Sequence, residues 1–257
     1  MTAVPAVAHR EDVMGTVVTI DVYTADGQAD GEIAAQLATA RAVLQQADAV
    51  FSTWNPDSPV SRLRRGEITC SQAPDEVRDV LERCAAAREL SGGWFDPWAM
   101  PSGVDPTGYV KGWAAQRALG AFHAGSISGV LMNAAGDIAS LGGLGGGEPF
   151  KIGIADPAIP RRLAAVVCLT GAIATSGTYE RGDHLIDPHS GRPAARAASA
   201  SVTGPDLGLA DALATAVAVA GPSGLALIEA LDGYEALVIT GDGTLRWTER
   251  FPFAGGP

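Results

Sequence analysis

The stretch LADALATAVAVA at residues 209–220 predicts a helix in which only Asp211 and Thr215 carry polar side chains. A second short helix is predicted at residues 222–231. The strand patterns EALVIT and TLRW then form a hairpin around the turn GDG at residues 241–243. Directly upstream, residues 199–203 have the pattern of a further strand. This part of the chain therefore predicts helices and neighbouring strands without a regular alternation of the two.

The rest of the chain continues this mixture. Helices are predicted at Gly31–Phe51, at residues 74–90 and at residues 109–122, and a loop is predicted at residues 96–105. Strands are predicted at residues 14–23, 129–133, 151–155, 164–170 and 172–175, the last two as a pair, and GGLGGG at residues 142–147 predicts a hairpin turn. We therefore expect an α+β fold, a single unit with a mixed β-sheet flanked by helices over residues 13–253. A flexible segment at residues 1–12 precedes it, and a two-lobed organisation is left open.

The composition excludes several classes of partner. The chain has 18 Lys and Arg against 29 Asp and Glu, a formal net charge of −11, so no electrostatic hold on nucleic acid or an anionic membrane is expected. Three cysteines without a CxxC spacing predict buried or inert thiols. We find no run of about 18 apolar residues and expect no membrane anchor in this chain. The expected location is cytoplasmic, or extracytoplasmic if a leader was removed.

The ADALAT motif at residues 210–215 is the first candidate site. Asp211 and Thr215 are four residues apart and project from one helix face. Their oxygens are hard ligands that suit Mg²⁺, and we expect them in the first turns of the helix, where backbone N–H groups favour anions. The alternative is an Asp that stabilises the helix dipole and a Thr that only packs.

The DPTGYVKG motif at residues 105–112 is the second. Lys111 is predicted near the start of a helix, which is an unfavourable place for a cation. The chain has only one other lysine, Lys151. This combination suggests that Lys111 meets an anion, although a solvated surface lysine is the alternative. Gly108 lacks a β-carbon, so its carbonyl can approach a metal closely.

Two further segments offer polar or aromatic groups. His184 lies within DHLIDPHSGRP and is a candidate for proton transfer, with a hydrogen-bonded loop histidine as the alternative. MNAAGD at residues 132–137 places a turn of small residues and Asp137 after a strand, where a ligand can approach the backbone. The aromatic residues Trp54, Trp94, Phe95 and Trp98 gather in predicted loops, which suggests a planar ligand or partial burial.

Nine motifs in a fixed order resemble the ApbE family of FAD:protein FMN transferases, from about Met14 to the C-terminal hairpin. They are MGT, FSTWNPDSPVSRL, GWFDP, DPTGYVKGWA, NAAGD, IGIADP, ATSGTYERG, HLIDPHSGRP and ADALATA. The resemblance implies a Mg²⁺-dependent enzyme that binds FAD and transfers its FMN half to a Thr or Ser hydroxyl of an acceptor protein, releasing AMP.

The resemblance also implies roles for individual residues. Asp211, Thr215 and the carbonyl of Gly108 would hold the metal, and His184 would be the acid–base residue. The FAD site would be lined by Met14, Trp54, Trp94, Phe95, Asp96, Asp105, Lys111 and Ile186.

The chain also departs from the family pattern. Ala135 stands where the family often has a second glycine, and Ala214 stands where some members have a further acidic ligand. The segments before DPTGYVKG and between Tyr179 and His184 are short. Two alternative functions are therefore kept, a Mg²⁺-dependent FAD pyrophosphatase that yields FMN and AMP, and a non-catalytic FAD-binding protein.

Overall fold

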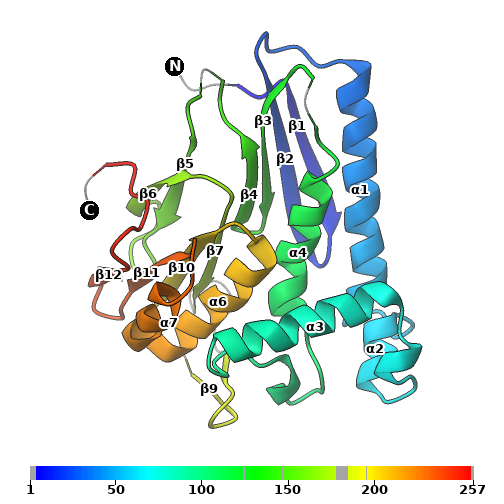
Figure 1. The fold of residues 1–257 in the computed structure, drawn as a ribbon, viewed down its shortest axis with the longest axis vertical. Coiled ribbons are helices and arrows are strands. Elements are labelled where there is room, and N and C mark those ends of the chain that lie inside the picture. The colour runs from blue at the N-terminus through cyan, green and yellow to red at the C-terminus, as the bar shows by residue number, and fades with distance from the viewer. Residues whose placement is uncertain (1–3, 124, 146, 178–184, 195, 256–257) are drawn as a thin grey trace.

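A computed structural model describes residues 4–255 except 124, 146, 178–184 and 195. Its centre is an eight-stranded sheet with the strand order β1-β2-β3-β4-β7-β10-β11-β12 (Figure 1). The strands of this sheet are β1 (Val7–Val13), β2 (Thr16–Thr24), β3 (Ile127–Ala134), β4 (Asp137–Gly142), β7 (Ala172–Gly177), β10 (Ser199–Gly204), β11 (Glu235–Ile239) and β12 (Leu245–Trp247). Two smaller pairs are β5 (Phe150–Ala155) with β6 (Leu163–Leu169), and β8 (Ile186–Asp187) with β9 (Arg192–Pro193).

The α+β class is confirmed, but the strand pairing differs from the expectation in two respects. Every pair among the described strands is antiparallel, where a mixed sheet was expected. The strands expected to pair across Gly171 separate instead, because β6 joins β5 while β7 joins β4 and β10. The glycine-rich connection is likewise no hairpin of one sheet, since β4 and β5 belong to different sheets.

Helices cover one face of the large sheet. Figure 1 shows α1, α4 and α6 along the same side, with α3 crossing at their lower ends. The helices are α1 (Gly31–Phe51), α2 (Pro59–Arg64), α3 (Asp75–Leu90), α4 (Thr107–Leu119), α6 (Leu207–Ala220) and α7 (Leu225–Glu229), with short 3₁₀ turns at Cys70–Gln72, Pro97–Ala99 and Gly221–Gly224. The main core lies between this layer and the sheet.

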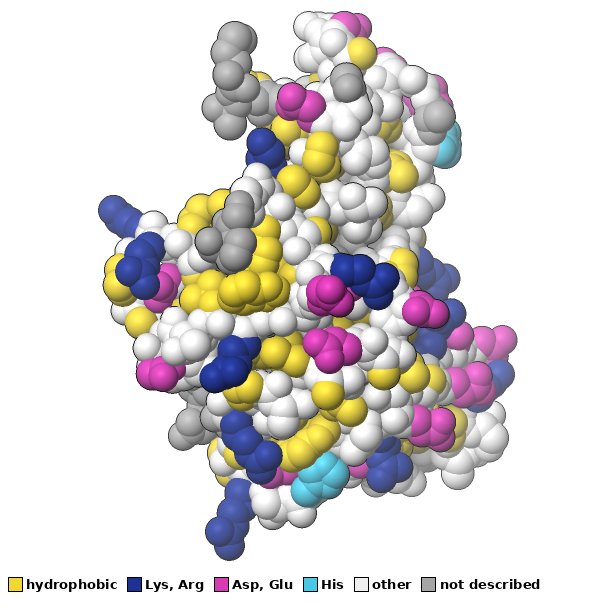
Figure 2. Space-filling model, turned by 60° about the vertical axis from the view of Figure 1, so that its left-hand side comes forward, with side chains coloured by type: hydrophobic (Ala, Val, Ile, Leu, Met, Phe, Trp, Pro, Cys, Tyr) yellow, Lys and Arg dark blue, Asp and Glu magenta, His cyan; other side chains and the backbone are white. Residues whose placement is uncertain are grey.

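The other face is covered in part by β5 and β6. Phe150 and Leu169 from this pair pack against Ile173 and Leu237 of the large sheet in a second apolar cluster. The C-terminal segment covers the edge of β6 through a bridge between Val167 and Phe253. On the face shown in Figure 2, acidic and basic side chains are interspersed around apolar ones.

Part of the N-terminal segment that was expected to be flexible forms a strand. Residues 7–13 form β1 and pair along their whole length with β2, so a hairpin stands where a single strand was predicted to begin at Met14. Met14 and Gly15 are the two turn residues, with φ of 56° and 66°. Two residues with positive φ give the turn that matches the twist of paired strands.

The β3–β4 hairpin uses the same kind of turn with an unfavourable residue. Ala134 pairs with Asp137, so Ala135 and Gly136 form the turn, with φ of 52° and 97°. The backbone N–H of Gly136 donates to the side chain of Asn133 at 2.8 Å. Ala135 thus adopts a left-handed backbone conformation that favours glycine, at a cost of about 1–2 kcal/mol for an L-residue.

We expect Ala135→Gly to stabilise the protein by about 1 kcal/mol, because glycine adopts a positive φ without a steric penalty. For a domain of this size the melting temperature should rise by roughly 2–4 °C in thermal unfolding. Ala38→Gly, at an exposed position within α1, is the matched control and should lower the melting temperature, since glycine disfavours a helix. A fall in both variants would contradict strain at Ala135.

The helical run that begins with α6 contradicts the expectation that no segment is long and apolar enough to span a membrane. The helical run Leu207–Glu229 has sufficient length and hydropathy, but 67% of its most apolar window is buried inside the fold. Figure 1 shows α6 lying against the sheet, and Ala210, Leu213 and Val217 belong to the main core. The apolar character of this run is that of a core helix.

Candidate functional site

The site lies where α4 crosses α6, with the backbones of the two helices in close contact. A β-carbon on Gly112 of α4 would lie 2.4 Å from the carbonyl oxygen of Leu207. One on Gly208 of α6 would lie 2.8 Å from the ring of Tyr109. Small residues on both helices therefore permit a close approach, which brings the segment around Lys111 next to the one that carries Asp211.

Two carboxylates are buried at this crossing. Asp137, the first residue of β4, is 0% exposed, and Asp211 of α6 is 4% exposed. Asp137 forms an ion pair with Lys111 and accepts a hydrogen bond from the backbone N–H of Thr175 at 3.1 Å. Asp211 accepts a hydrogen bond from the backbone N–H of Gly112 and lies against Asp137. Within the described part of the chain, Oδ2 of Asp211 and Oδ2 of Asp137 are both buried without a hydrogen-bond partner, and of the two only the oxygen of Asp137 has an ion pair, with Lys111.

The two acidic groups oppose each other's ionisation. Burial is the main reason that the pKa of Asp211 lies well above its ordinary value, and the negative charge of Asp137 raises that pKa further. Lys111 and the N–H of Gly112 act in the opposite direction. Burial also raises the pKa of the Cys84 thiol on α3 to about 12, with a contribution from the charge of Asp211. Without a cation, the site therefore favours a protonated Asp211.

We expect the metal-free protein to lose stability as the pH rises above about 4, because folded Asp211 keeps a proton that the unfolded chain releases near that pH. The loss continues until the pH passes the raised pKa of the folded state. Thermal unfolding in EDTA between pH 5 and 8 measures the effect. The melting temperature should fall more steeply with pH in the wild type than in Asp211→Asn, and parallel curves would contradict the assignment.

Hydroxyl oxygens lie beside the carboxylates. Thr215 Oγ1 and Ser176 Oγ are 3.1 Å apart and share a hydrogen bond. A β-carbon on Gly108 would lie 3.9 Å from Thr215 Oγ1 and 3.3 Å from the ring of Phe95. Gly108, Lys111, Asp211 and Thr215, which the sequence places in two separate motifs, are thus brought together by the packing of α4 on α6.

The donor set fits a hard divalent cation. Among the described residues, no group of three or more His, Cys, Asp or Glu side chains lies close enough to hold a metal ion. A cation at Asp211 would therefore take further ligands from hydroxyl, carbonyl or water oxygens, as Mg²⁺ commonly does. The buried Asp211 Oδ2 without a partner and the nearby Thr215 hydroxyl are consistent with such a site.

The position of Asp211 in its helix differs from the expectation. Helix α6 begins at Leu207, and the side chain of Asp206 accepts a hydrogen bond from the backbone N–H of Leu209 at 2.8 Å. Asp206 therefore caps the helix, and Asp211 and Thr215 lie in later turns. Since free N–H groups occur only in the first turn, they contribute no anion site at Thr215.

The aromatic residues occupy different environments. Phe95 is buried in the main core, whereas Trp54 is 90% exposed on the loop between α1 and α2. Trp94 is half-buried, and its ring meets His189 edge-on with centroids 4.5 Å apart. The guanidinium of Arg196 lies 4.9 Å from the centroid of the same ring. The loop aromatics thus form no single cluster, and Trp94 belongs to a separate contact with the segment that follows β8.

The remaining FAD-site candidates have local roles of their own. Asp96 accepts a hydrogen bond from the backbone N–H of Trp98 and forms an ion pair with Arg88 at 2.7 Å. Asp105 accepts from the backbone N–H of Thr107 at the start of α4. Met14 lies in the β1–β2 turn, and Ile186 is half-buried in β8. These contacts explain the residues structurally and leave their proposed ligand contacts as predictions.

His184 lies outside the described residues, so its role stays a prediction. The sequence reasoning understated Asp137, which it treated as part of a turn near a ligand. The missing information was spatial: the β4–β7 pairing and the position of α4 bring Asp137 to Lys111 and Asp211. Asp187, which the sequence offered as a polar residue of the same segment as His184, is buried and contacts Arg196 at 3.5 Å.

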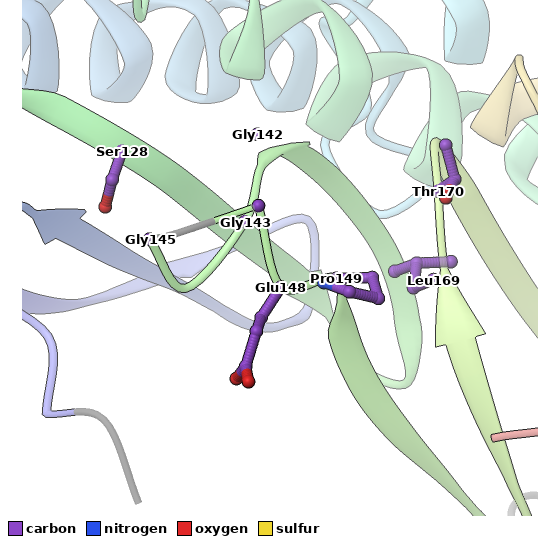
Figure 3. A pocket seen from close by; sticks show the side chains of 9 residues that line it. Ser128, Gly142, Gly143, Gly145, Glu148, Pro149, Leu169 and Thr170 are labelled. Atoms are coloured by element: carbon purple, nitrogen blue, oxygen red, sulfur yellow. The ribbon is translucent and has the colours of Figure 1, made fainter. Parts of the chain in front are cut away.

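A separate cavity lies away from this group of residues. It has a volume of about 390 Å³ and lies between the end of β4 and the β5–β6 pair. Figure 3 shows Ser128, Glu148 and Leu169 around it, with glycine backbone between them. None of its lining residues belongs to the group around Asp211, so it is not the site described above.

Comparisons with known proteins agree on one family. The model of the ApbE family matches residues 14–104 and 100–238. An FAD:protein FMN transferase from Rhodobacter capsulatus is 36% identical over 152 residues, which are 55% of this chain and 29% of that protein. The match therefore spans less than a third of the length of that curated relative.

Solved structures share the fold. The ApbE protein from Thermotoga maritima has a TM-score of 0.81 at 22% identity, covering 95% of this chain and 97% of that one. The flavin transferase ApbE from Vibrio cholerae has a TM-score of 0.79 at 23% identity, covering 94% and 96%. The flavinyl transferase ApbE from Pseudomonas stutzeri has a TM-score of 0.79 at 23% identity, covering 98% of each chain. With the family model matching most of its length, this chain belongs to the ApbE family.

Proposed function

We propose that this protein transfers the FMN moiety of FAD to a Thr or Ser hydroxyl of an acceptor protein, in a Mg²⁺-dependent reaction that releases AMP. The observation that carries the proposal is the buried Asp137–Asp211 pair beside Lys111, in which one oxygen of Asp211 has no hydrogen-bond partner among the residues that the structure describes. Family membership and the R. capsulatus relative, named as an FAD:protein FMN transferase, support the same activity.

The residues suit the displacement at phosphorus that this reaction requires. The acceptor oxygen forms a bond to the phosphorus of the FMN half, and the bond from that phosphorus to the bridging oxygen breaks, so that AMP leaves with the bridging oxygen. Such reactions need positioning and charge neutralisation rather than covalent catalysis. Mg²⁺ held by Asp211, Thr215 and the carbonyl of Gly108 would supply positive charge to the phosphate oxygens.

The other residues of the site bind and orient. Lys111 supplies a fixed positive charge from the second turn of α4, and the buried walls around Asp137 exclude water, which strengthens its electrostatic contacts. His184 is proposed to accept the proton of the attacking hydroxyl. Met14, Trp94, Phe95, Asp96, Asp105 and Ile186 are proposed to line the FAD site, with Trp54 at its exposed margin.

Incubation with FAD, MgCl₂ and a candidate flavoprotein subunit tests the proposal. Mass spectrometry of the acceptor should show the addition of one FMN moiety, with AMP in solution and no addition in EDTA. Free FMN and AMP without a change in the acceptor would instead indicate a pyrophosphatase. Intact FAD that stays bound would indicate a non-catalytic flavin-binding protein.

A further inference from the structure

Asp137 has a more constrained environment than any role in a turn requires. Its carboxylate is 0% exposed and is held from two sides. The backbone N–H of Thr175 on β7 donates to Oδ1 at 3.1 Å, and Oδ2 forms the ion pair with Lys111 on α4. Three elements, β4, β7 and α4, therefore fix the position and orientation of this group.

Lys111 needs such a partner to be held in place. A lysine side chain is a flexible four-carbon chain with a compact charge, and without a partner it samples many rotamers. Its side chain here is 22% exposed, so the ammonium lies at the boundary between the buried carboxylates and the surface. A buried carboxylate next to it defines one position for the ammonium.

We propose that Asp137 is a positioning residue, whose carboxylate holds the Lys111 ammonium where it meets a phosphate oxygen of FAD. This inference rests on the proposed function and adds a residue to it. Asp137 itself need not touch FAD, since its oxygens are already directed to Thr175 and Lys111. The alternative is an ion pair that stabilises the fold and has no influence on FAD.

Coupling between the two residues separates these roles. If Asp137 acts through Lys111, replacing Asp137 weakens FAD binding only while Lys111 is present. Asp137→Asn is the suitable change, because its side-chain oxygen still accepts the Thr175 N–H while the negative charge is lost. Lys111→Met removes the ammonium and keeps the apolar length of the side chain.

FAD affinity is measured by flavin fluorescence, with MgCl₂ and no acceptor protein, for the wild type, both single variants and the double variant. We expect Asp137→Asn to weaken binding about tenfold or more, as for the loss of one charged contact, and to change it less than twofold in the Lys111→Met background. Asp75→Asn removes a surface ion pair with Arg78 and should leave the affinity unchanged. Equal losses in both backgrounds, or no loss in either, would overturn the proposal.

A second measurement needs no substitution. Because the chain has two lysines, labelling lysine with ¹³C at Cε gives two resonances, from Lys111 and the exposed Lys151. Addition of FAD with MgCl₂ should shift the Lys111 resonance and leave that of Lys151 in place. An unmoved Lys111 resonance at saturating FAD would overturn the proposal even if Asp137→Asn does not fold. A wild type that binds no FAD would overturn the proposed function itself.

Discussion

Asp211→Asn is expected to lower the rate of FMN transfer by about 10³-fold while making the metal-free protein more stable. Each tenfold loss corresponds to about 1.4 kcal/mol, so the change represents roughly 4 kcal/mol of transition-state stabilisation. A loss of this size is reasonable if Asp211 binds the cation that offsets the charge on the reacting phosphate. The amide keeps the size of the side chain but is a far weaker ligand for Mg²⁺.

The gain in stability has a separate cause. Asp211 and Asp137 are both buried, and the charge of Asp137 raises the pKa of Asp211. Asparagine carries no charge, so folding requires neither repulsion between two carboxylates nor the uptake of a proton at this position, and the ion pair between Lys111 and Asp137 is kept. Relief of an unfavourable functional site commonly contributes about 0.5–2 kcal/mol. The opposite changes in activity and stability distinguish a functional carboxylate from one that only maintains the fold.

Transfer is measured by the mass of the acceptor at several MgCl₂ concentrations, and stability by thermal unfolding in EDTA. The wild type should gain stability when MgCl₂ replaces EDTA, and Asp211→Asn should not. Asp232→Asn, at an exposed turn position, is the matched control and should resemble the wild type in every respect. Wild-type transfer by Asp211→Asn would remove this residue from the metal site.

Local signals were sufficient to predict the longer helices, whereas the short helix α2 was not predicted. Helix α1 has the predicted bounds because Asp30 caps it, accepting from the N–H of Ile33 at 2.9 Å, and its apolar residues recur with helical spacing. The C-terminal hairpin of β11 and β12 is also confirmed, since its glycine-rich turn lies between two apolar strands. In these cases one segment contains all the information that its structure requires.

Strand pairing could not be predicted in the same way. Residues 7–13 read VAHREDV, and their charged residues hide a strand that is stabilised by pairing with β2. The short link at Gly171 resembles a hairpin turn, yet β6 pairs with β5 in a small sheet while β7 pairs with β4 and β10 in the large one. Leu169 of β6 packs against Ile173 of β7 between the two sheets. Pairing depends on contacts between distant segments, which one sequence does not reveal.

The candidate site could be predicted only in part, because it too depends on contacts between distant segments. Asp211 and Thr215 stand out because they interrupt an apolar helix, and Lys111 because lysines are scarce. The anion that Lys111 meets within the protein is Asp137, which neighbours it only in space. The resemblance to a family supplied residue roles, whereas the structure supplied the buried carboxylate pair and the contact between α4 and α6.

Gly112→Ala is expected to have the second large effect, a loss of stability of about 3 kcal/mol accompanied by loss of transfer. The added β-carbon would lie 2.4 Å from the carbonyl oxygen and 2.8 Å from the carbonyl carbon of Leu207. Both are backbone atoms that no rotamer change can move, so the helices must separate. Overpacking of this kind costs about 1–3 kcal/mol or more, which exceeds the roughly 1 kcal/mol that alanine gains in helix propensity.

Separation of α4 from α6 also moves Lys111 away from Asp211, so transfer should fall even at temperatures where Gly112→Ala is folded. Thermal unfolding should show a melting temperature lower by roughly 6–12 °C for a domain of this size. Gly31→Ala is the matched control, because a β-carbon at this first position of α1 meets no atom within 4 Å. That variant should keep wild-type stability and activity. If Gly112→Ala did the same, the close crossing of α4 and α6 would not be what holds the two halves of the site together.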